Sequence, residues 1–156
     1  MKNTHTNLAE RYLILIKIDS ENLFERIKER EKIYMEHFSA KRDRNIFDEV
    51  FVNRYAQASM FDLAHLPSEV IELANDFYTT VDLLYWYLMH TEDMPNAIED
   101  EVIRNIALIG KKFTVLTLYI DAELSGEISN NKSEDLTKSN DLFIQEDDLN
   151  ALEDIP

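Results

Sequence analysis

The side chains best suited to metal binding or acid–base catalysis are four histidines, namely His5, His37, His65 and His90. Helical proteins that bind two metal ions need a Glu-x-x-His pair on each of two helices and two further glutamates. The nearest approach is a single Asp62-x-x-His65, with aspartate in place of glutamate. Because the sequence has no second pair of this kind, we predict no metal site. We interpret His65 and His90 as residues near helix ends, where a cation meets the helix dipole.

Other arrangements that carry out chemistry are not found in the sequence. There is no nucleophile elbow, no P-loop and no glycine-rich dinucleotide fingerprint. Paired carboxylates such as Asp76 and Asp82 occur, but a chance pair is expected among 31 acidic residues and indicates little. The sequence therefore predicts a protein that is not an enzyme and that uses no cofactor.

The composition favours long helices. The chain has 156 residues, a length that suggests one domain, and 45% of them are hydrophobic. Only 2 glycines and 3 prolines occur, which argues against a turn-rich β fold. We predict an all-α fold, a small helical bundle of four to five helices over residues 7–125. A flexible acidic tail with a short amphipathic peptide is predicted for residues 126–156.

The net charge of −15 limits the partners that we expect. It repels phosphate, so we predict no nucleic acid and no binding to anionic membranes. The first 19 residues do not resemble a secretory signal, because their apolar run is short and contains Lys17. No run approaches the ~20 apolar residues of a membrane span. The absence of cysteine is typical of a reducing compartment, and we expect a cytoplasmic protein.

The segment from Pro67 to His90 is predicted to be the central helix. Its apolar residues recur at spacings of three and four, which is the period of an amphipathic helix. They are Val70, Leu73, Ala74, Phe77, Val81, Leu84 and Leu88. Flanking residues, among them Tyr78, Tyr85 and Trp86, widen the apolar face, as expected for burial on two sides. Core packing is the main interpretation of these aromatic residues, with a ligand pocket or a partner surface as alternatives.

The other helices are predicted from similar spacing. Residues 8–18 fit either a helix or a buried strand that pairs across a dimer, and we favour the helix. Further helices are expected over residues 20–38, 46–66 and from Pro95 or Asn96 to Leu124, the last ended by Gly126. Gly110 inside this last helix indicates a close helix approach. We also expect a homo-oligomer. Its candidate contact residues are Tyr85, Trp86, Leu118 and Tyr119.

The end of the chain combines an apolar cluster with an acidic amphipathic turn. Residues 127–141 are polar and unpatterned, and we predict that they form a flexible tether. Exposed phenylalanine and isoleucine lower solubility unless something covers them. We therefore predict that the segment either docks on its own body or binds another protein. The candidate partner-binding residues are Leu142, Phe143, Ile144, Asp148, Leu149 and Leu152.

Residues 144–152, IQEDDLNAL, resemble the N-terminal peptide of the flagellar motor switch protein, whose pattern reads roughly L-S-Q-x-E-I-D-A-L. Ile144 matches the first apolar position, Asp148 the acid, and Leu149 the isoleucine. Asn150, Ala151 and Leu152 fall on the last three positions, whereas Gln145 and Glu146 depart from the pattern. The resemblance covers the tail alone and implies binding to phosphorylated chemotaxis response regulators.

These observations lead to one main functional hypothesis and two alternatives. The main hypothesis is a non-enzymatic protein–protein interaction module, an adaptor or regulator. The tail resemblance places it in bacterial signalling or motility. The first alternative is a small-molecule-binding or enzymatic bundle with an aromatic pocket near Tyr78, Tyr85, Trp86 and Tyr87. The second is a secretion-type chaperone, favoured by acidic charge and small size.

Overall fold

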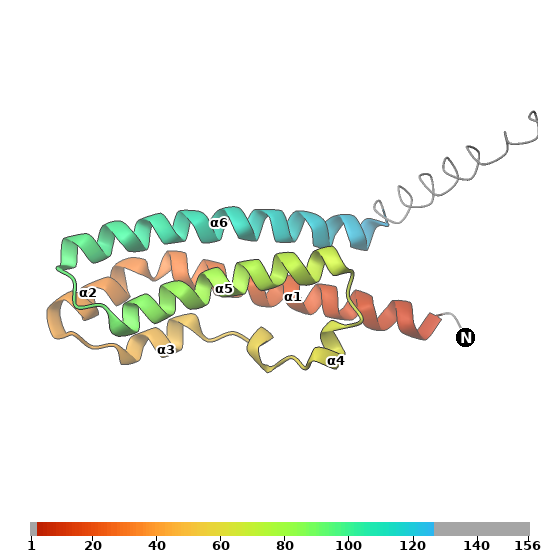
Figure 1. Cartoon of the computed structure of the whole chain (residues 1–156), viewed down its shortest axis with the longest axis horizontal. Coiled ribbons are helices and arrows are strands. Elements are labelled where there is room, and N and C mark those ends of the chain that lie inside the picture. The colour runs from red at the N-terminus through yellow and green to blue at the C-terminus, as the bar shows by residue number, and fades with distance from the viewer. Residues whose placement is uncertain (1–2, 127–156) are drawn as a thin grey trace, which may run out of the picture. The chain divides into compact units, whose positions relative to one another are not determined.

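The computed structural model describes residues 3–126, and in that range it contains helices and no strand. The predicted all-α class is therefore confirmed. Figure 1 shows its elements, α1 (Asn3–Glu29), α2 (Glu31–Lys41), α3 (Asn45–Phe51), the 3₁₀-helix η1 (Tyr55–Gln57), α4 (Met60–Leu63), α5 (Ser68–His90) and α6 (Pro95–Ser125). This range holds more helices than the four to five predicted. The short elements α3, η1 and α4 occupy residues 46–66, which were expected to form one helix.

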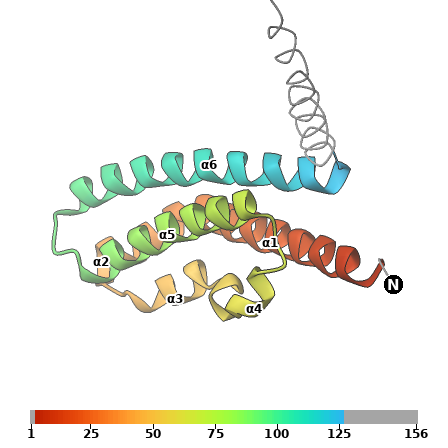
Figure 2. The same ribbon diagram turned by 45° about the vertical axis from the view of Figure 1, so that its right-hand side comes forward.

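Of the described residues, 3–121 form one compact unit, and residues 122–126 belong to another. Within the first unit, α1 and α5 lie between α6 on one side and the short helices α3 and α4 on the other (Figure 2). The helix α3 packs against both α1 and α5. None of the helices between residues 3 and 126 is long and apolar enough to cross a membrane.

The first helix is longer than the sequence suggested. The prediction of helix over residues 8–18 is confirmed, but Ser20 does not start a new helix. It is buried inside α1, where its hydroxyl donates to the backbone carbonyl of Lys17 at 3.0 Å. The interruption comes instead at Arg30, between α1 and α2. A small polar side chain that bonds to its own helix can thus be mistaken for a helix cap.

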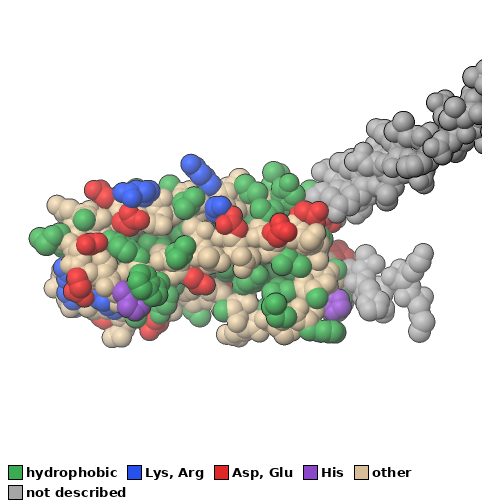
Figure 3. Space-filling view, in the orientation of Figure 1, with side chains coloured by type: hydrophobic (Ala, Val, Ile, Leu, Met, Phe, Trp, Pro, Cys, Tyr) green, Lys and Arg blue, Asp and Glu red, His purple; other side chains and the backbone are tan. Residues whose placement is uncertain are grey.

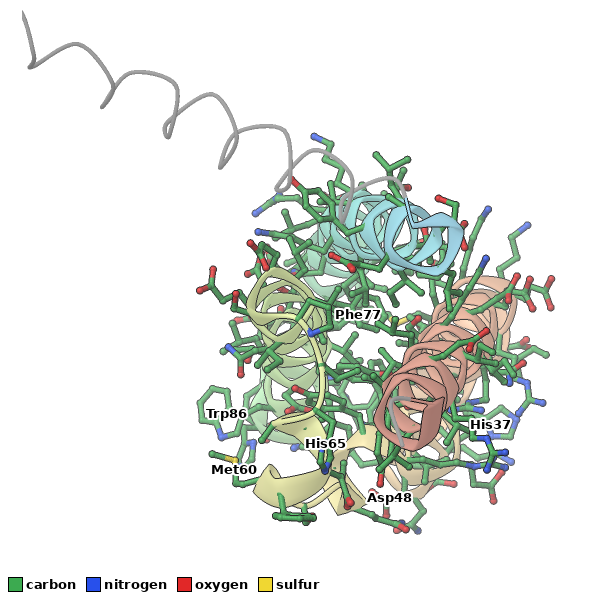
Figure 4. The ribbon with its side chains drawn as sticks, turned by 90° about the vertical axis from the view of Figure 1, so that its right-hand side faces the viewer. His37, Asp48, Met60, His65, Phe77 and Trp86 are labelled. Carbon is green, nitrogen blue, oxygen red and sulfur yellow. The ribbon has the colours of Figure 1, made fainter. Side chains whose placement is uncertain are left out.

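The helix α5 supplies much of the core, as predicted, and begins at Ser68, one residue after Pro67. Figure 4 shows Phe77 pointing into the interior, where its ring lies 6.2 Å from that of Phe113 on α6. Leu73, at the edge of the predicted stripe, is only partly buried. The buried residues of α5 are Val70, Ala74, Phe77, Tyr78, Thr80, Val81, Leu84 and Leu88.

At Gly110 of α6, where the sequence suggested a close helix approach, the contact is made by the Phe24 side chain of α1. A Cβ atom at this position would lie 3.1 Å from Cζ of the Phe24 ring. Two ion pairs also join α6 to its neighbours: Lys112 meets Asp76 of α5, and Lys17 of α1 meets Asp121, each at 2.5 Å. Gly126 follows the end of α6 with a φ of 77°, the left-handed conformation expected of a C-terminal glycine.

Arg42 and Arg44 help to end two helices of this chain. The carbonyl groups in the last turn of a helix lack partners within the helix. At the end of α5, Arg44 donates to the carbonyl oxygen of Thr91 at 2.7 Å and also to that of Met89. Arg42, with a φ of 50°, ends α2 in the left-handed conformation. The basic cluster around residue 42 thus forms the connection between α2 and α3.

Candidate functional site

The main departure from the predicted fold lies between residues 52 and 59. The apolar spacing predicted one helix over residues 46–66, and that prediction is wrong. The helix α3 ends at Phe51, only η1 interrupts the irregular stretch that follows, and α4 starts at Met60. This stretch leaves backbone N–H and C=O groups that no local helix satisfies.

Two side chains of α1 satisfy these backbone groups. Arg26 donates from Nε to the carbonyl oxygen of Val50 at 2.8 Å and from Nη2 to that of Val52, at the end of α3. Asp19 accepts from the backbone N–H groups of Arg54 at 3.0 Å and of Tyr55 at 3.3 Å, at the start of η1. Residues 19 and 26 are two turns apart on one face of α1. The helix α1 therefore holds the interruption in place.

Tyr78 connects this arrangement to the core. Its hydroxyl donates to Oδ2 of Asp19 at 2.9 Å, and its ring stacks on that of Tyr55 with centroids 4.1 Å apart. Burial raises the pKa of Tyr78 well above its usual value, and the charge of Asp19 and the hydrogen bond to it act in the same direction. Burial also raises the pKa of Tyr55. Both phenols are therefore neutral near pH 7.

The helix α4 is short but firmly held. Ser59 and Asp62 form a reciprocal capping box, and the hydroxyl of Tyr12 donates to Oδ1 of Asp62 at 2.7 Å. Hydrogen bonds, first from the Ser59 side chain and then from Tyr12, lower the pKa of Asp62. This anchoring presents Met60 and Phe61 to solvent, with 86% and 75% of their surfaces exposed. Figure 4 shows Met60 on the outside of the molecule.

A groove of about 630 Å³ lies between α1 and residues 52–63. It follows α1 from Tyr12 to Arg30, which is roughly 27 Å at 1.5 Å per residue. Leu15 and Ile18 line it with 55% and 45% of their surfaces exposed. We use the name docking face for the exposed apolar residues in and beside this groove. They are Leu15, Ile18 and Val52, which line the groove, and Ile14, Met60 and Phe61, which are exposed on α1 and α4, the helices that contribute to it.

The four residues predicted to make oligomer contacts lie on α5 and α6. Tyr85 packs on Phe51, and its hydroxyl donates to Asp48 at 2.5 Å. Trp86 is exposed, stacked on the ring of His90, and points outward in Figure 4. Leu118 and Tyr119 are also exposed. Figure 3 shows a face on which hydrophobic side chains are interspersed with charged ones. Contact through these residues stays a prediction.

Of the aromatic residues proposed for a ligand pocket, Tyr78 lines the groove, whereas Tyr85, Trp86 and Tyr87 do not. Tyr78 is buried and reaches the groove next to α1, whereas Trp86 points away from the interior. The Asp62-x-x-His65 pair also has other contacts, since the His65 ring stacks on Tyr12 and meets the edge of Phe61. Within residues 3–126, no group of three or more histidine and acidic side chains is arranged to hold a metal ion.

The candidate partner-binding residues of the tail lie outside the described residues. They are Leu142, Phe143, Ile144, Asp148, Leu149 and Leu152. Comparisons of the chain with protein-family models, curated proteins and solved structures find no match. The resemblance of residues 144–152 to the switch-protein peptide therefore stays a prediction, and function must be argued from the site itself.

Sequence reasoning missed most of the groove. Asp19 and Arg26 gave a weak signal, because two opposite charges seven residues apart share one helix face and can contact a single neighbouring segment. Leu15 gave a misleading one, because it lies in a run of apolar residues in which only Leu13 and Ile16 turn inward. Nothing in the sequence indicated that residues 52–59 would leave the helical conformation.

The burial of Tyr78 predicts sensitivity to alkaline pH. An unfolded tyrosine loses its proton near pH 10, whereas Tyr78 keeps it in the folded chain because its pKa is raised. Its contribution to stability is therefore complete below about pH 10 and falls as pH rises further, by about 1.4 kcal/mol per unit. Urea denaturation from about pH 9 to 11 should show a shallower decline for Tyr78→Phe. Identical slopes would contradict the assignment.

Proposed function

We propose that this chain is a non-enzymatic protein–protein interaction module, an adaptor or regulator, that binds protein through the docking face. The observation that carries the proposal is the contrast between polar and apolar groups in the groove. Of the charged residues that line the groove, Asp19, Arg26 and Asp62 already make side-chain hydrogen bonds that hold the fold. The apolar side chains beside them are exposed.

This contrast favours burial of an apolar partner surface over chemistry. Catalytic acids and bases must reach the reacting atoms, and a carboxylate that already accepts several hydrogen bonds is poorly placed to do so. By contrast, Phe61, Met60 and Leu15 are exposed on anchored elements, and exposed apolar patches mark interaction sites. Rigid apolar side chains of this kind form the centres of protein interfaces. The tail residues 142–152 supply a second candidate contact with a partner.

The test is site-specific photo-crosslinking in living cells. Asn22 lines the groove and Asn75 lies on α5, and both are exposed asparagines on a helix. We expect a crosslinker at Asn22 to give a protein adduct and the same crosslinker at Asn75 to give none. A chain that ends at Asp141 then reports whether the tail residues 142–156 take part. Absence of any adduct at Asn22 would contradict the proposed function.

A second candidate, small-molecule binding, is favoured by the size of the groove. A volume of about 630 Å³ falls within the range of known ligand sites, roughly 300–1,000 Å³. Native mass spectrometry of the purified chain distinguishes the two functions. A bound small molecule would add a discrete mass, and Ala58→Trp, which fills part of the groove, would remove it. The interaction-module account expects no such mass.

A further inference from the structure

We propose that the docking face binds a second copy of this chain in an antiparallel, two-fold symmetric dimer. The proposal deepens the proposed function and rests on it, because it names the protein that covers the face. Two features of the described residues support it independently. One is the order of charges along α1, and the other is the position of α4 relative to the groove.

The charged residues of α1 are placed so that two antiparallel copies of the helix bring opposite charges together. The apolar residues Ile14 and Ile18 lie at equal distances on either side of residue 16. Arg11 comes five residues before that point and Glu21 five residues after it, each about 7.5 Å along the helix. Both charged side chains are exposed. Two copies of α1 packed antiparallel about residue 16 therefore place Ile14 opposite Ile18, and Arg11 opposite Glu21.

The two ends of the groove are also complementary. Tyr12 holds α4, with the exposed Met60 and Phe61, beside the N-terminal half of α1. Arg26 holds Val52 beside its C-terminal half. A two-fold axis that passes between the two copies of α1 at residue 16, perpendicular to both helices, exchanges these two ends. The α4 of each copy then faces the Val52 end of the groove in the other copy, as an isologous interface requires.

This arrangement also explains how so acidic a chain can self-associate. The net charge of −15 opposes contact between copies in general. Along the proposed contact of the two α1 helices, however, Ile14 and Ile18 carry no charge, and Arg11 of each copy meets Glu21 of the other. Repulsion between like charges disfavours the parallel alternative, in which Arg11 would face Arg11. The charge pattern thus favours one orientation over the other.

The test is a charge exchange, measured by sedimentation of the full chain over a range of concentrations. We expect a dimer of twice 18.4 kDa. Arg11→Glu and Glu21→Arg should each weaken the dimer roughly ten- to thirtyfold, because symmetry turns two attractive pairs into repulsive ones. The double variant should restore dimerisation. Residues 11 and 21 are about 15 Å apart within one α1, so rescue must arise between copies.

A second set of variants covers the case in which the charged pairs are too weak to measure. Ile18→Asp should abolish the dimer, whereas Leu118→Asp, an equally drastic change at the alternative oligomer contact that the sequence suggested on α6, should leave it unchanged. Circular dichroism checks that both variants fold. A dimer that persists in Ile18→Asp, or that is lost only in Leu118→Asp, would overturn the proposal. So would single charge reversals that the double variant does not rescue.

The outcomes separate this proposal from the proposed function. A monomeric chain whose Asn22 crosslinks to a different protein would overturn the dimer and leave the interaction module intact. An Asn22 adduct of about 37 kDa, twice the 18.4 kDa of the chain, supports both. A monomeric chain with no adduct at Asn22 would overturn both.

Discussion

Replacing Asp19 by alanine is expected to lower the free energy of unfolding by about 2–3 kcal/mol. The substitution removes the acceptor for two backbone N–H groups of η1 and for the hydroxyl of Tyr78. The Tyr78 side chain is only 4% exposed, so water cannot readily replace the lost carboxylate. The backbone N–H groups of Arg54 and Tyr55 are more accessible to water, so the loss of their acceptor lowers stability less. Urea denaturation monitored by circular dichroism measures the change.

Two further substitutions give this prediction its controls. Glu72→Ala removes an exposed acid from α5, away from the docking face, and should change stability by less than about 0.5 kcal/mol. Asp19→Asn keeps one acceptor oxygen but loses the charge, and an intermediate effect is expected. If Asp19→Ala and Glu72→Ala had equal effects, Asp19 could not be what holds residues 52–59.

Replacing Phe77 by alanine should have the largest effect on stability, about 3–5 kcal/mol. The Phe77 side chain is fully buried, and its ring lies 4.9 Å from that of Tyr78 and 6.2 Å from that of Phe113. Truncation removes contacts between α5 and α6 and leaves a cavity that the surrounding helices can fill only in part. The measurement is the free energy of unfolding in urea at about pH 7.

The matched control for Phe77 is Leu83 on the same helix. Leu83 is 63% exposed, so Leu83→Ala should change the unfolding free energy by less than about 0.5 kcal/mol. The difference between the two variants tests the assignment of the inner and outer faces of α5. A loss below about 1 kcal/mol for Phe77→Ala would show that α5 is not the centre of the core.

Helical periodicity was sufficient to predict α5 and α6. Burial repeats every three to four residues when a helix packs along its whole length, and the sequence shows this repeat directly. Ile98, Val102 and Ile109 of α6 are buried as the spacing predicted. Gly110 was expected to mark a contact, because a glycine inside a helix lowers stability unless a neighbour needs the space; the neighbour is the Phe24 ring.

The interruption at residues 52–59 could not be predicted, because its cause is distant in the sequence. Phe47, Val50 and Phe51 continue at helical spacing toward Tyr55, and local periodicity favours an unbroken helix. Arg26 bonds to carbonyl groups that lie 24 and 26 positions further along the chain. Asp19 bonds to N–H groups that lie 35 and 36 positions further along. Only tertiary packing reveals that α1 satisfies the freed backbone groups.

The docking face was hidden for a different reason. Residues 12–18 are almost all apolar, so their pattern does not show which side of α1 faces the core. The structure turns Leu13 and Ile16 inward and leaves Ile14, Leu15 and Ile18 exposed. The partner-binding role of residues outside the described range, among them Phe143 and Leu149, stays a prediction. The site was therefore predicted less well than the fold.

The central claim is that the exposed apolar side chains of α1 bind protein. It is tested most directly by the yield of the Asn22 crosslinked adduct in cells that express the Ile18→Asp chain. We expect this yield to fall at least roughly tenfold, because a charge at the centre of the face opposes burial, while circular dichroism shows an intact fold. An adduct formed in equal yield by the folded variant would contradict the account.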